Sequence, residues 1–353
     1  MNHISGLRAI LERREADALL LTSEVSQRYA VNFPFSDGYV LITPRNALLL
    51  TDFRYKEEAE SHVDPMITVV TPSSFSEYLS DIIATKGIKR LMYEDRSLTC
   101  ARFDELCREL TFEPIPAGDE IERLRAVKDE EELAFIRSAQ SITDRAYRHI
   151  LSLITPAMTE VDVVLELEFF MRRSGADGIA FPTIAVSGAA SALPHGLPSR
   201  RPLEKGFLTM DFGASINGYA SDMTRTVSIG KATAEMKRIY RTVAEAQRRG
   251  MAAICAGVPS SLVDATARSY IDSEGYRGLF GHSFGHGVGL EIHEAPRLSS
   301  RSAAPLSAGN VVTAEPGIYL PGECGCRIEN MGLVTENGFV SFAESSTELI
   351  ELY

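Results

Sequence analysis

The chain has 353 residues, of which 44% are hydrophobic and 24% are charged, and its net charge is −12. This length and apolar content suit a protein of two globular domains. The acidic balance argues against a surface for nucleic acid or anionic membranes, which reward clustered Lys and Arg. We recognise no signal peptide, no apolar run of about 18 residues and no disulfide framework among the five cysteines, so we expect a cytoplasmic protein without membrane spans.

Helix and strand signals alternate over roughly the first third of the chain. The spacing of apolar residues predicts helices over 4–15, 54–61, 75–85 and 101–110, and strands over 18–21, 38–43, 47–51 and 90–93. This alternation is typical of an α/β domain. Pro114, Pro116 and Gly118 form a cluster of residues that break regular structure, which we interpret as the domain boundary. We therefore predict an N-terminal domain over residues 1–122 and a second domain over residues 123–353.

The second domain begins with helix signals and then becomes rich in strand signals. Asp129 followed by Glu132 predicts a capped helix start, and Thr159 predicts the start of another helix that runs to about Arg173. From Phe181 onward, short β-type segments alternate with Gly, Asn and Pro turns. This half is therefore predicted to be an α+β domain built around an antiparallel sheet.

The first candidate site is a hairpin. Asn217-Gly218 between β-type flanks predicts a tight turn, which places residue 213 opposite Asp222 and puts Asp211 on the same face, diagonal to Asp222. Two carboxylates on one face repel each other unless a cation lies between them, and hard divalent metals prefer oxygen ligands. The alternative is that one Asp serves the turn and the other caps a strand end.

The second candidate is a glycine-rich segment with histidines. His282, His286 and His293 lie within twelve positions of a chain that has only seven histidines. Glycines on both sides of His286 would let the backbone crowd a buried site, and His286 is a natural metal ligand. The segment matches neither the dinucleotide fingerprint nor the His-Glu-x-x-His zinc motif. A lone His is more often structural, but this concentration favours a site.

The third candidate is a pair of β segments around Pro321-Gly322. A loop centred on Gly322 places Glu315 opposite Glu329. A Glu in an apolar strand needs a partner when it is buried, and a metal would supply one. The alternative is an ion pair with Arg327 or another Arg.

The three candidates together offer two Asp, one His and two Glu. Four anionic ligands carry too much negative charge for one structural zinc ion, which prefers Cys and His. They suit two divalent ions that share bridging carboxylates and hold a water or hydroxide between them. The sequence therefore predicts a two-metal hydrolytic site.

These three blocks, in this order and spacing, resemble the pita-bread metallopeptidases, which include methionine aminopeptidase, aminopeptidase P and prolidase. The similarity extends to the segments 181–188 and 192–196. The segments 36–39 and 51–55 are similar to the N-terminal domain of the proline-specific branch, which methionine aminopeptidases lack. The resemblance implies a creatinase/prolidase-like α/β domain over 1–122 and a catalytic α+β pita-bread domain, with a curved antiparallel sheet, over 123–353.

The resemblance also implies a role for each site residue. Asp211 would bind one metal, Asp222 and Glu329 would bridge both metals, and His286 and Glu315 would bind the second, with Glu315 also acting as general base on the bridging water. His195 and His293 match two outer histidines that contact the substrate and stabilise the oxyanion, His282 matches a pocket-lining His, and Arg297 falls where prolidases bind the free carboxylate of proline.

The activity that the resemblance implies is hydrolysis of an Xaa-Pro bond, in a peptide substrate with proline at the second position. Aminopeptidase P acts on longer peptides and prolidase on dipeptides, and both remain open, although Arg297 leans toward prolidase. The implied cofactors are two divalent ions, Mn or Co, with Zn or Fe as alternatives.

Two alternative functions belong to different classes. One is a creatinase-like, metal-free amidinohydrolase and the other is a non-catalytic peptide-binding module, and proteins of both kinds typically lack the metal ligands. We expect a homodimer because family members commonly dimerise. Cys324 and Cys326 depart from the family pattern. A Cys-x-Cys pair could bind a soft metal, but we interpret them as reduced, packed thiols that make the site sensitive to oxidation.

Overall fold

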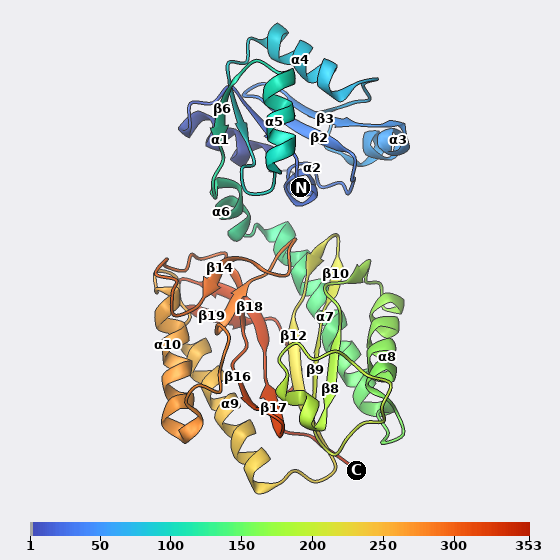
Figure 1. Cartoon of the computed structure of the whole chain (residues 1–353), viewed down its shortest axis with the longest axis vertical. Helices are drawn as coiled ribbons and strands as arrows, with labels where there is room; N and C mark the ends of the chain where they lie inside the picture. The colour runs from blue at the N-terminus through green and yellow to red at the C-terminus, as the bar shows by residue number, and fades with distance from the viewer. Residues whose placement is uncertain (1–2) are drawn as a thin grey trace. The chain divides into compact units, whose positions relative to one another are not determined.

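The computed structural model describes residues 3–353, which divide into two compact units, one that extends through Arg125 and one over Ala126–Tyr353 (Figure 1). Among residues 3–353, no helix is long and apolar enough to cross a membrane.

The N-terminal unit is built on one mixed sheet. Within residues 3–125, its six strands lie in the order β4-β3-β2-β1-β5-β6. Their bounds are Ala18–Leu21 for β1, Gly38–Ile42 for β2, Ala47–Thr51 for β3, Ile67–Val70 for β4, Arg90–Tyr93 for β5 and Glu113–Pro116 for β6. Strands β1, β2 and β3 pair antiparallel, whereas β4, β5 and β6 join them in parallel.

Helices cover both faces of this sheet. They are α1 (Ile4–Arg13), α2 (Glu24–Val31), α3 (Phe53–His62), α4 (Phe75–Lys86), α5 (Cys100–Glu109) and α6 (Glu120–Ala126). Leu19 and Leu21 of β1 belong to one buried cluster, and Ala18 and Leu20 belong to another. Because successive side chains of a strand point to opposite faces, a strand buried on both sides reads as a continuous apolar run. The unit is thus the α/β domain that the sequence predicts.

The proline cluster at the end of this unit does not form a linker. Pro114 and Pro116 lie in β6, which is an edge strand paired with β5 alone within residues 3–125. An edge strand tolerates proline because one of its sides donates no ladder hydrogen bond. The cluster thus belongs to the N-terminal unit. Helix α6 follows it, and the unit ends at Arg125, three residues beyond the predicted bound at residue 122.

The C-terminal unit contains two pairs of long helices. Helices α7 (Glu130–Leu153) and α8 (Glu160–Arg173) precede the main strands, and α9 (Ala234–Ala253) and α10 (Ser260–Ile271) lie between them in the chain. Asp129 and Glu132 form a reciprocal capping box at the start of α7. Thr159 and Asp162 form another at the start of α8, so both predicted helix starts are confirmed.

The strands of this unit form small sheets that are mostly antiparallel. Within residues 126–353, one sheet has the order β20-β12-β9-β8, a second β14-β13-β15-β18-β19, a third β11-β10-β7, and β16 pairs with β17. The bounds are Gly178–Ile179 for β7, Ile184–Ser187 for β8, Gly206–Phe212 for β9, Ala214–Ile216 for β10, Tyr219–Ala220 for β11, Met223–Ile229 for β12, Gly285–Gly287 for β13, Glu294–Leu298 for β14, Val311–Ala314 for β15, Gly317–Leu320 for β16, Cys324–Arg327 for β17, Asn330–Thr335 for β18, Gly338–Ser341 for β19 and Glu351–Leu352 for β20.

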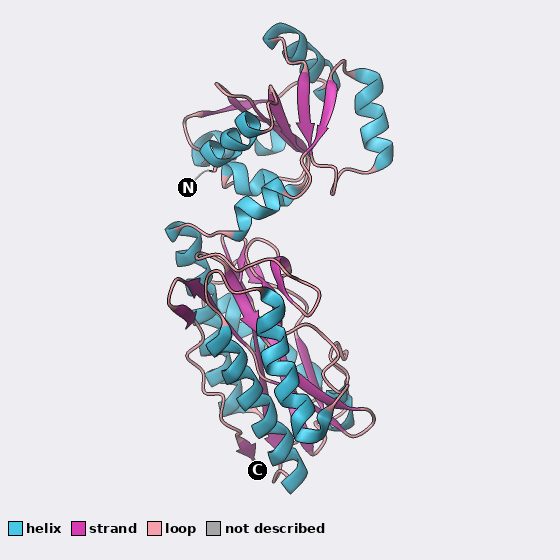
Figure 2. Cartoon of the chain, turned by 90° about the vertical axis from the view of Figure 1, so that its left-hand side faces the viewer, coloured by secondary structure: helices cyan, strands magenta, loops and turns pink. Residues whose placement is uncertain are grey.

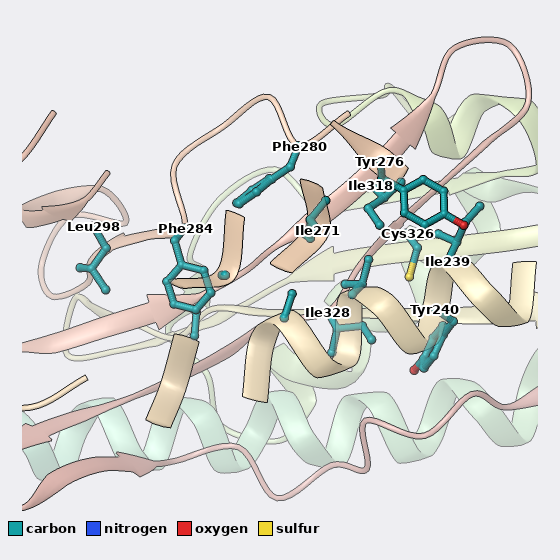
Figure 3. Close-up of a cluster of buried hydrophobic side chains, with 14 of the residues drawn as sticks. Ile239, Tyr240, Ile271, Tyr276, Phe280, Phe284, Leu298, Ile318, Cys326 and Ile328 are labelled. Atoms are coloured by element: carbon teal, nitrogen blue, oxygen red, sulfur yellow. The ribbon is translucent and has the colours of Figure 1, made fainter. Parts of the chain in front are cut away.

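The two helix pairs pack on different sheets. Residues of α7 and α8 share a buried cluster with β9 and β12, and residues of α9 and α10 share another with β15, β16 and β17. Figure 2 shows the helices lying alongside the strands, and Figure 3 shows Ile318, Cys326 and Ile328 directed into the second cluster with Phe280 and Phe284. This is the predicted α+β architecture with a pita-bread domain, and the alternate residues of these strands remain available for a site.

Candidate active site

The first predicted hairpin has the expected register. Asn217 and Gly218 form the turn with φ angles of 47° and 80°, as a tight hairpin turn requires. Ile216 pairs with Tyr219, and the same register continues to Asp211, which pairs with Thr224. Asp222 therefore lies diagonal to Asp211, as predicted.

The second predicted hairpin also has the expected register. Ala314 pairs with Asn330, and Gly317 pairs with Arg327. These two pairs bracket Glu315 and Glu329, which consequently lie opposite each other in the short gaps between strands. Turn chemistry fixes hairpin register, so a turn identified in the sequence locates carboxylates many residues away.

The two hairpins and β13 bring an acidic cluster around His286. The Nε2 atom of His286 lies 3.2 Å from Oε1 of Glu315 and 3.6 Å from Oδ2 of Asp222. One ligand atom from each of Asp222, His286 and Glu329 lies within 4.8 Å of the others. This spacing leaves room for cations bound by carboxylate and imidazole atoms.

All the predicted site residues line one cavity of about 590 Å³. They are His195, Asp211, Asp222, His282, His286, His293, Arg297, Glu315 and Glu329.

The electrostatics of the cluster show crowded negative charge. Burial, followed by repulsion from Glu315 and Asp211, raises the pKa of Glu329 to about 8. Burial and the same neighbours, together with Glu329, raise the pKa of Asp222 well above its usual value. Carboxylates that resist ionisation when they are close together and buried are stabilised by a cation between them. This acidic cluster therefore fits divalent metals.

His286 and Glu315 behave as an ion pair within the cluster. Burial opposes charge on both, but the hydrogen bond and charge of His286 lower the pKa of Glu315 to about 2. Burial likewise disfavours the imidazolium, yet Glu315 raises the pKa of His286 above its usual value. The Nδ1 atom of His286 lies 3.1 Å from the carbonyl oxygen of Gly287, which directs Nε2 toward the carboxylates.

Asp211 contacts a buried arginine and still has one free oxygen. Its Oδ2 accepts a hydrogen bond of 2.7 Å from Nη2 of Arg327, whereas its Oδ1 is buried without a hydrogen-bond partner among residues 3–353. A buried carboxylate oxygen without a partner is costly. A metal ligated by Oδ1 would remove this cost, which is a second observation in favour of the metal assignment.

Arg327 is the site residue that sequence reasoning did not identify as such. It was considered only as an alternative partner for a buried Glu, and the structure pairs it with Asp211 instead. Its other hydrogen bonds go to Thr224 Oγ1 at 3.0 Å, Tyr319 Oη at 2.8 Å and the carbonyl oxygen of Pro194 at 3.2 Å. The alternation of side chains along a strand could have indicated Arg327 as a site residue, because it lies two residues before Glu329 and therefore on the same face.

The outer residues of the cavity differ in exposure. His195, His293 and Arg297 are exposed. Burial, followed by the charge of His286, lowers the pKa of His293. The predicted pocket residue His282 has its Nε2 atom 2.9 Å from the hydroxyl of Tyr319. Apolar side chains complete the lining: Phe181, Pro182, Ile184, Leu197, Pro198 and Ile292.

The two unexpected cysteines face away from this chemistry. Cys326 is buried in the cluster of Figure 3, Cys324 packs against it, and both are free thiols. Both are packed, as interpreted from the sequence, but burial raises the pKa of both thiols and so disfavours the reactive thiolate, which argues against the expected sensitivity of the site to oxidation.

Comparison with known proteins yields one consistent family. The model of metallopeptidase family M24 matches residues 134–336, and that of the creatinase/prolidase N-terminal domain matches residues 3–127. The structure is similar to an Xaa-Pro dipeptidase from Bacillus anthracis, with a TM-score of 0.95, 42% identity and 99% of each chain covered. It is also similar to an X-Pro aminopeptidase from Thermotoga maritima MSB8, with a TM-score of 0.94, 35% identity and 100% of each chain covered. An Xaa-Pro dipeptidase of Pyrococcus horikoshii is 35% identical over 96% of each chain. These matches confirm the resemblance inferred from the motifs: the chain belongs to metallopeptidase family M24 and carries a creatinase/prolidase N-terminal domain.

Proposed function

We propose that this protein is a two-metal peptidase that hydrolyses the bond preceding a proline at the second position of its substrate. The observation that carries the proposal is the single cavity that joins the acidic cluster to exposed histidines, an arginine and an apolar wall. The similarity to proteins named Xaa-Pro dipeptidase and X-Pro aminopeptidase supports the same substrate class.

The acidic cluster would hold two divalent ions. We assign Asp211 to one ion, His286 and Glu315 to the other, and Asp222 and Glu329 to both. When bound, the ions supply Lewis-acid activation of water and of the scissile carbonyl. Carboxylate-rich ligation suits Mn or Co.

The side chains around the ions would move the protons. Glu315 is ionised at neutral pH because its pKa is lowered to about 2, so it accepts a proton from the attacking water and passes it to the proline nitrogen as the bond breaks. His293 is neutral at pH 7 because its pKa is lowered, and it donates an N–H to the carbonyl oxygen as negative charge develops there. His195, on the same cavity wall, would share this task.

The outer cavity supports the dipeptide form of the activity. The guanidinium of Arg297 is exposed in the lining, and Arg297 pairs with His286 across β13 and β14. A guanidinium held there would bind the free carboxylate of a C-terminal proline through two hydrogen bonds. Phe181 and Ile292 offer apolar contacts for the proline ring.

The first experiment tests the chemistry. Protein stripped with a chelator and reloaded with Mn²⁺ or Co²⁺ is assayed for release of free amino acid from an Xaa-Pro dipeptide. Glu315→Gln should lower kcat about a hundredfold to ten-thousandfold, because an amide does not accept the proton. Glu323→Gln, an exposed position on the loop of the same hairpin, is the matched control and should keep full activity. Absence of metal-dependent cleavage would refute the proposal and leave a binding module or another amide hydrolase.

The second experiment separates dipeptides from longer peptides. Cleavage of an Xaa-Pro dipeptide without cleavage of an Xaa-Pro-Yaa tripeptide would identify a prolidase. In that case Arg297→Ala should raise KM for the dipeptide about ten- to a hundredfold, whereas Arg301→Ala, an exposed control, should not. Cleavage of the tripeptide would favour the second candidate, an aminopeptidase P, which the similarity to the X-Pro aminopeptidase supports.

A further inference from the structure

His195 is carried by a long connection between β8 and β9. We call residues 187–199 the His195 loop; it contains a short 3-10 helix over Gly188–Ala192 and the cavity-lining residues Pro194–Pro198. Among residues 3–353, no group forms a hydrogen bond with the imidazole of His195 itself, so the position of this ring depends on the loop.

A single buried carboxylate holds both ends of the His195 loop. Oε1 of Glu160 accepts hydrogen bonds from the amide nitrogen of Ser187 at 2.7 Å and from its Oγ at 2.9 Å. Oε2 accepts from the amide nitrogen of Ser199 at 2.9 Å and from its Oγ at 2.8 Å. Glu160 is only 3% exposed and is the first residue of α8, where the helix dipole favours a negative charge.

The rest of the loop is tied to the strands of the active site. The Oγ atom of Ser191 accepts a hydrogen bond of 2.9 Å from the amide of Gly325 in β17, and Arg327 donates to the carbonyl oxygen of Pro194. These contacts hold the middle of the loop. At its ends, Ser187 pairs with Leu208 in the sheet and the carbonyl oxygen of Ser199 accepts a hydrogen bond from the amide of Val161, and the Glu160 carboxylate ties the two ends to each other. Freeing the ends would add conformational freedom to the segment that carries His195.

We propose that Glu160 is a positioning residue for the peptidase reaction: by closing the ends of the His195 loop, it holds His195 on the cavity wall near His293. This inference rests on the role of His195 in the proposed function. A carboxylate has acceptor sites for all the donors of both serines, which no neutral side chain of the same size provides. Because small errors in the position of a catalytic group are costly, the effect should appear in the rate of the chemical step.

The test compares Glu160→Gln with a matched buried glutamate. Glu94 of the N-terminal unit is 7% exposed and accepts hydrogen bonds from the amide and hydroxyl groups of Thr22 and Ser23. Both Gln substitutions should lower stability, because an amide leaves some buried donors without acceptors. Only Glu160→Gln should also lower kcat, by about ten- to a hundredfold, with KM changed less than about threefold. Equal kcat for the two variants would overturn the inference.

Coupling to His195 distinguishes positioning from general destabilisation. If Glu160 acts through His195, adding Glu160→Gln to His195→Ala should cause no further loss of kcat. An additive loss in the double variant would overturn the inference. Glu160→Asp, which keeps the acceptor atoms on a shorter side chain, should restore part of the activity. If Glu160→Gln does not fold, Ser199→Ala removes one of the four hydrogen bonds to the Glu160 carboxylate, together with two longer ones of 3.4 Å from Arg201. It should lower kcat several-fold in the wild-type background but not beside His195→Ala.

Hydrogen exchange provides a readout that needs no substrate. The amides of the His195 loop should exchange faster in Glu160→Gln than in wild type, whereas Glu94→Gln should leave them unchanged. A wild-type protein that cleaves no Xaa-Pro peptide would refute the proposed function. An unchanged exchange rate in Glu160→Gln would instead refute the role of Glu160.

Discussion

The buried acids of the active site predict how the stability of the metal-free protein depends on pH. Burial and mutual repulsion raise the pKa of Glu329 from 4.5 to about 8, and the pKa of Asp222 is raised well above its usual value. Above pH 6.5 both groups are ionised in the unfolded chain, whereas folded Glu329 retains its proton until about pH 8. The folded state then binds more protons than the unfolded state, so its stability falls as the pH rises.

The histidines of the site do not reverse this sign. Glu315 raises the pKa of His286, so its stabilising contribution is likewise lost as the pH rises. Burial lowers the pKa of His282 and His293, which are therefore neutral in both folded and unfolded chains through most of the window above pH 6.5. One extra bound proton changes the free energy of unfolding by about 1.4 kcal/mol per pH unit. Between pH 6.5 and 8, the titration of Glu329 alone should therefore lower the free energy of unfolding by about 2 kcal/mol.

The assay is urea unfolding in the presence of a chelator at several pH values between 6.5 and 8. Glu329→Gln should show a shallower decline, because its amide does not titrate. Adding Mn²⁺ should abolish most of the decline, because the bound cations keep the carboxylates ionised in the folded protein. A free energy of unfolding that stays constant or increases with pH in the chelated wild-type protein would refute the reasoning.

Three further substitutions test the packing and the contacts of the C-terminal unit. Lys128→Met should destabilise it by about 3–5 kcal/mol in urea unfolding, because Lys128 forms a buried ion pair with Glu294; a loss below about 1 kcal/mol would contradict this. Gly250→Ala should lower the free energy of unfolding by about 1–3 kcal/mol in the same measurement, because the added Cβ would lie 2.2 Å from the ring of Phe284. Unchanged stability would show that the ring moves aside. Arg327→Lys should weaken Mn²⁺ binding about ten- to a hundredfold in calorimetric titration, because a lysine cannot donate to Asp211 while it also reaches Thr224 and Tyr319; unchanged affinity would limit Arg327 to a structural role.

The parts of the site that could be predicted are those set by local turn chemistry. Asn217-Gly218 requires a tight hairpin turn, so the diagonal of Asp211 and Asp222 follows from counting residues. The same count around Gly322 places Glu315 opposite Glu329. Helix starts with a capping box were equally readable, because both members of the box lie within one turn.

The parts that could not be predicted depend on contacts between segments far apart in the chain. Arg327 could pair with several carboxylates on the same face, and only the packing of β17 against β9 selects Asp211. The burial of Glu160 beneath two serines likewise has no local signal. Pro114 and Pro116 indicated a break in regular structure but lie in a strand, because an edge strand and a linker tolerate the same residues.

The distribution of the proposed ligands along the chain has a consequence for biosynthesis. Asp211 and Asp222 lie on the hairpin that precedes α9, whereas Glu315 and Glu329 follow α10. A nascent chain that has reached residue 300 thus carries two of the four carboxylates and has not yet made the strands that complete the cavity. The complete set of proposed ligands therefore becomes available only late in synthesis, when the domain is nearly finished.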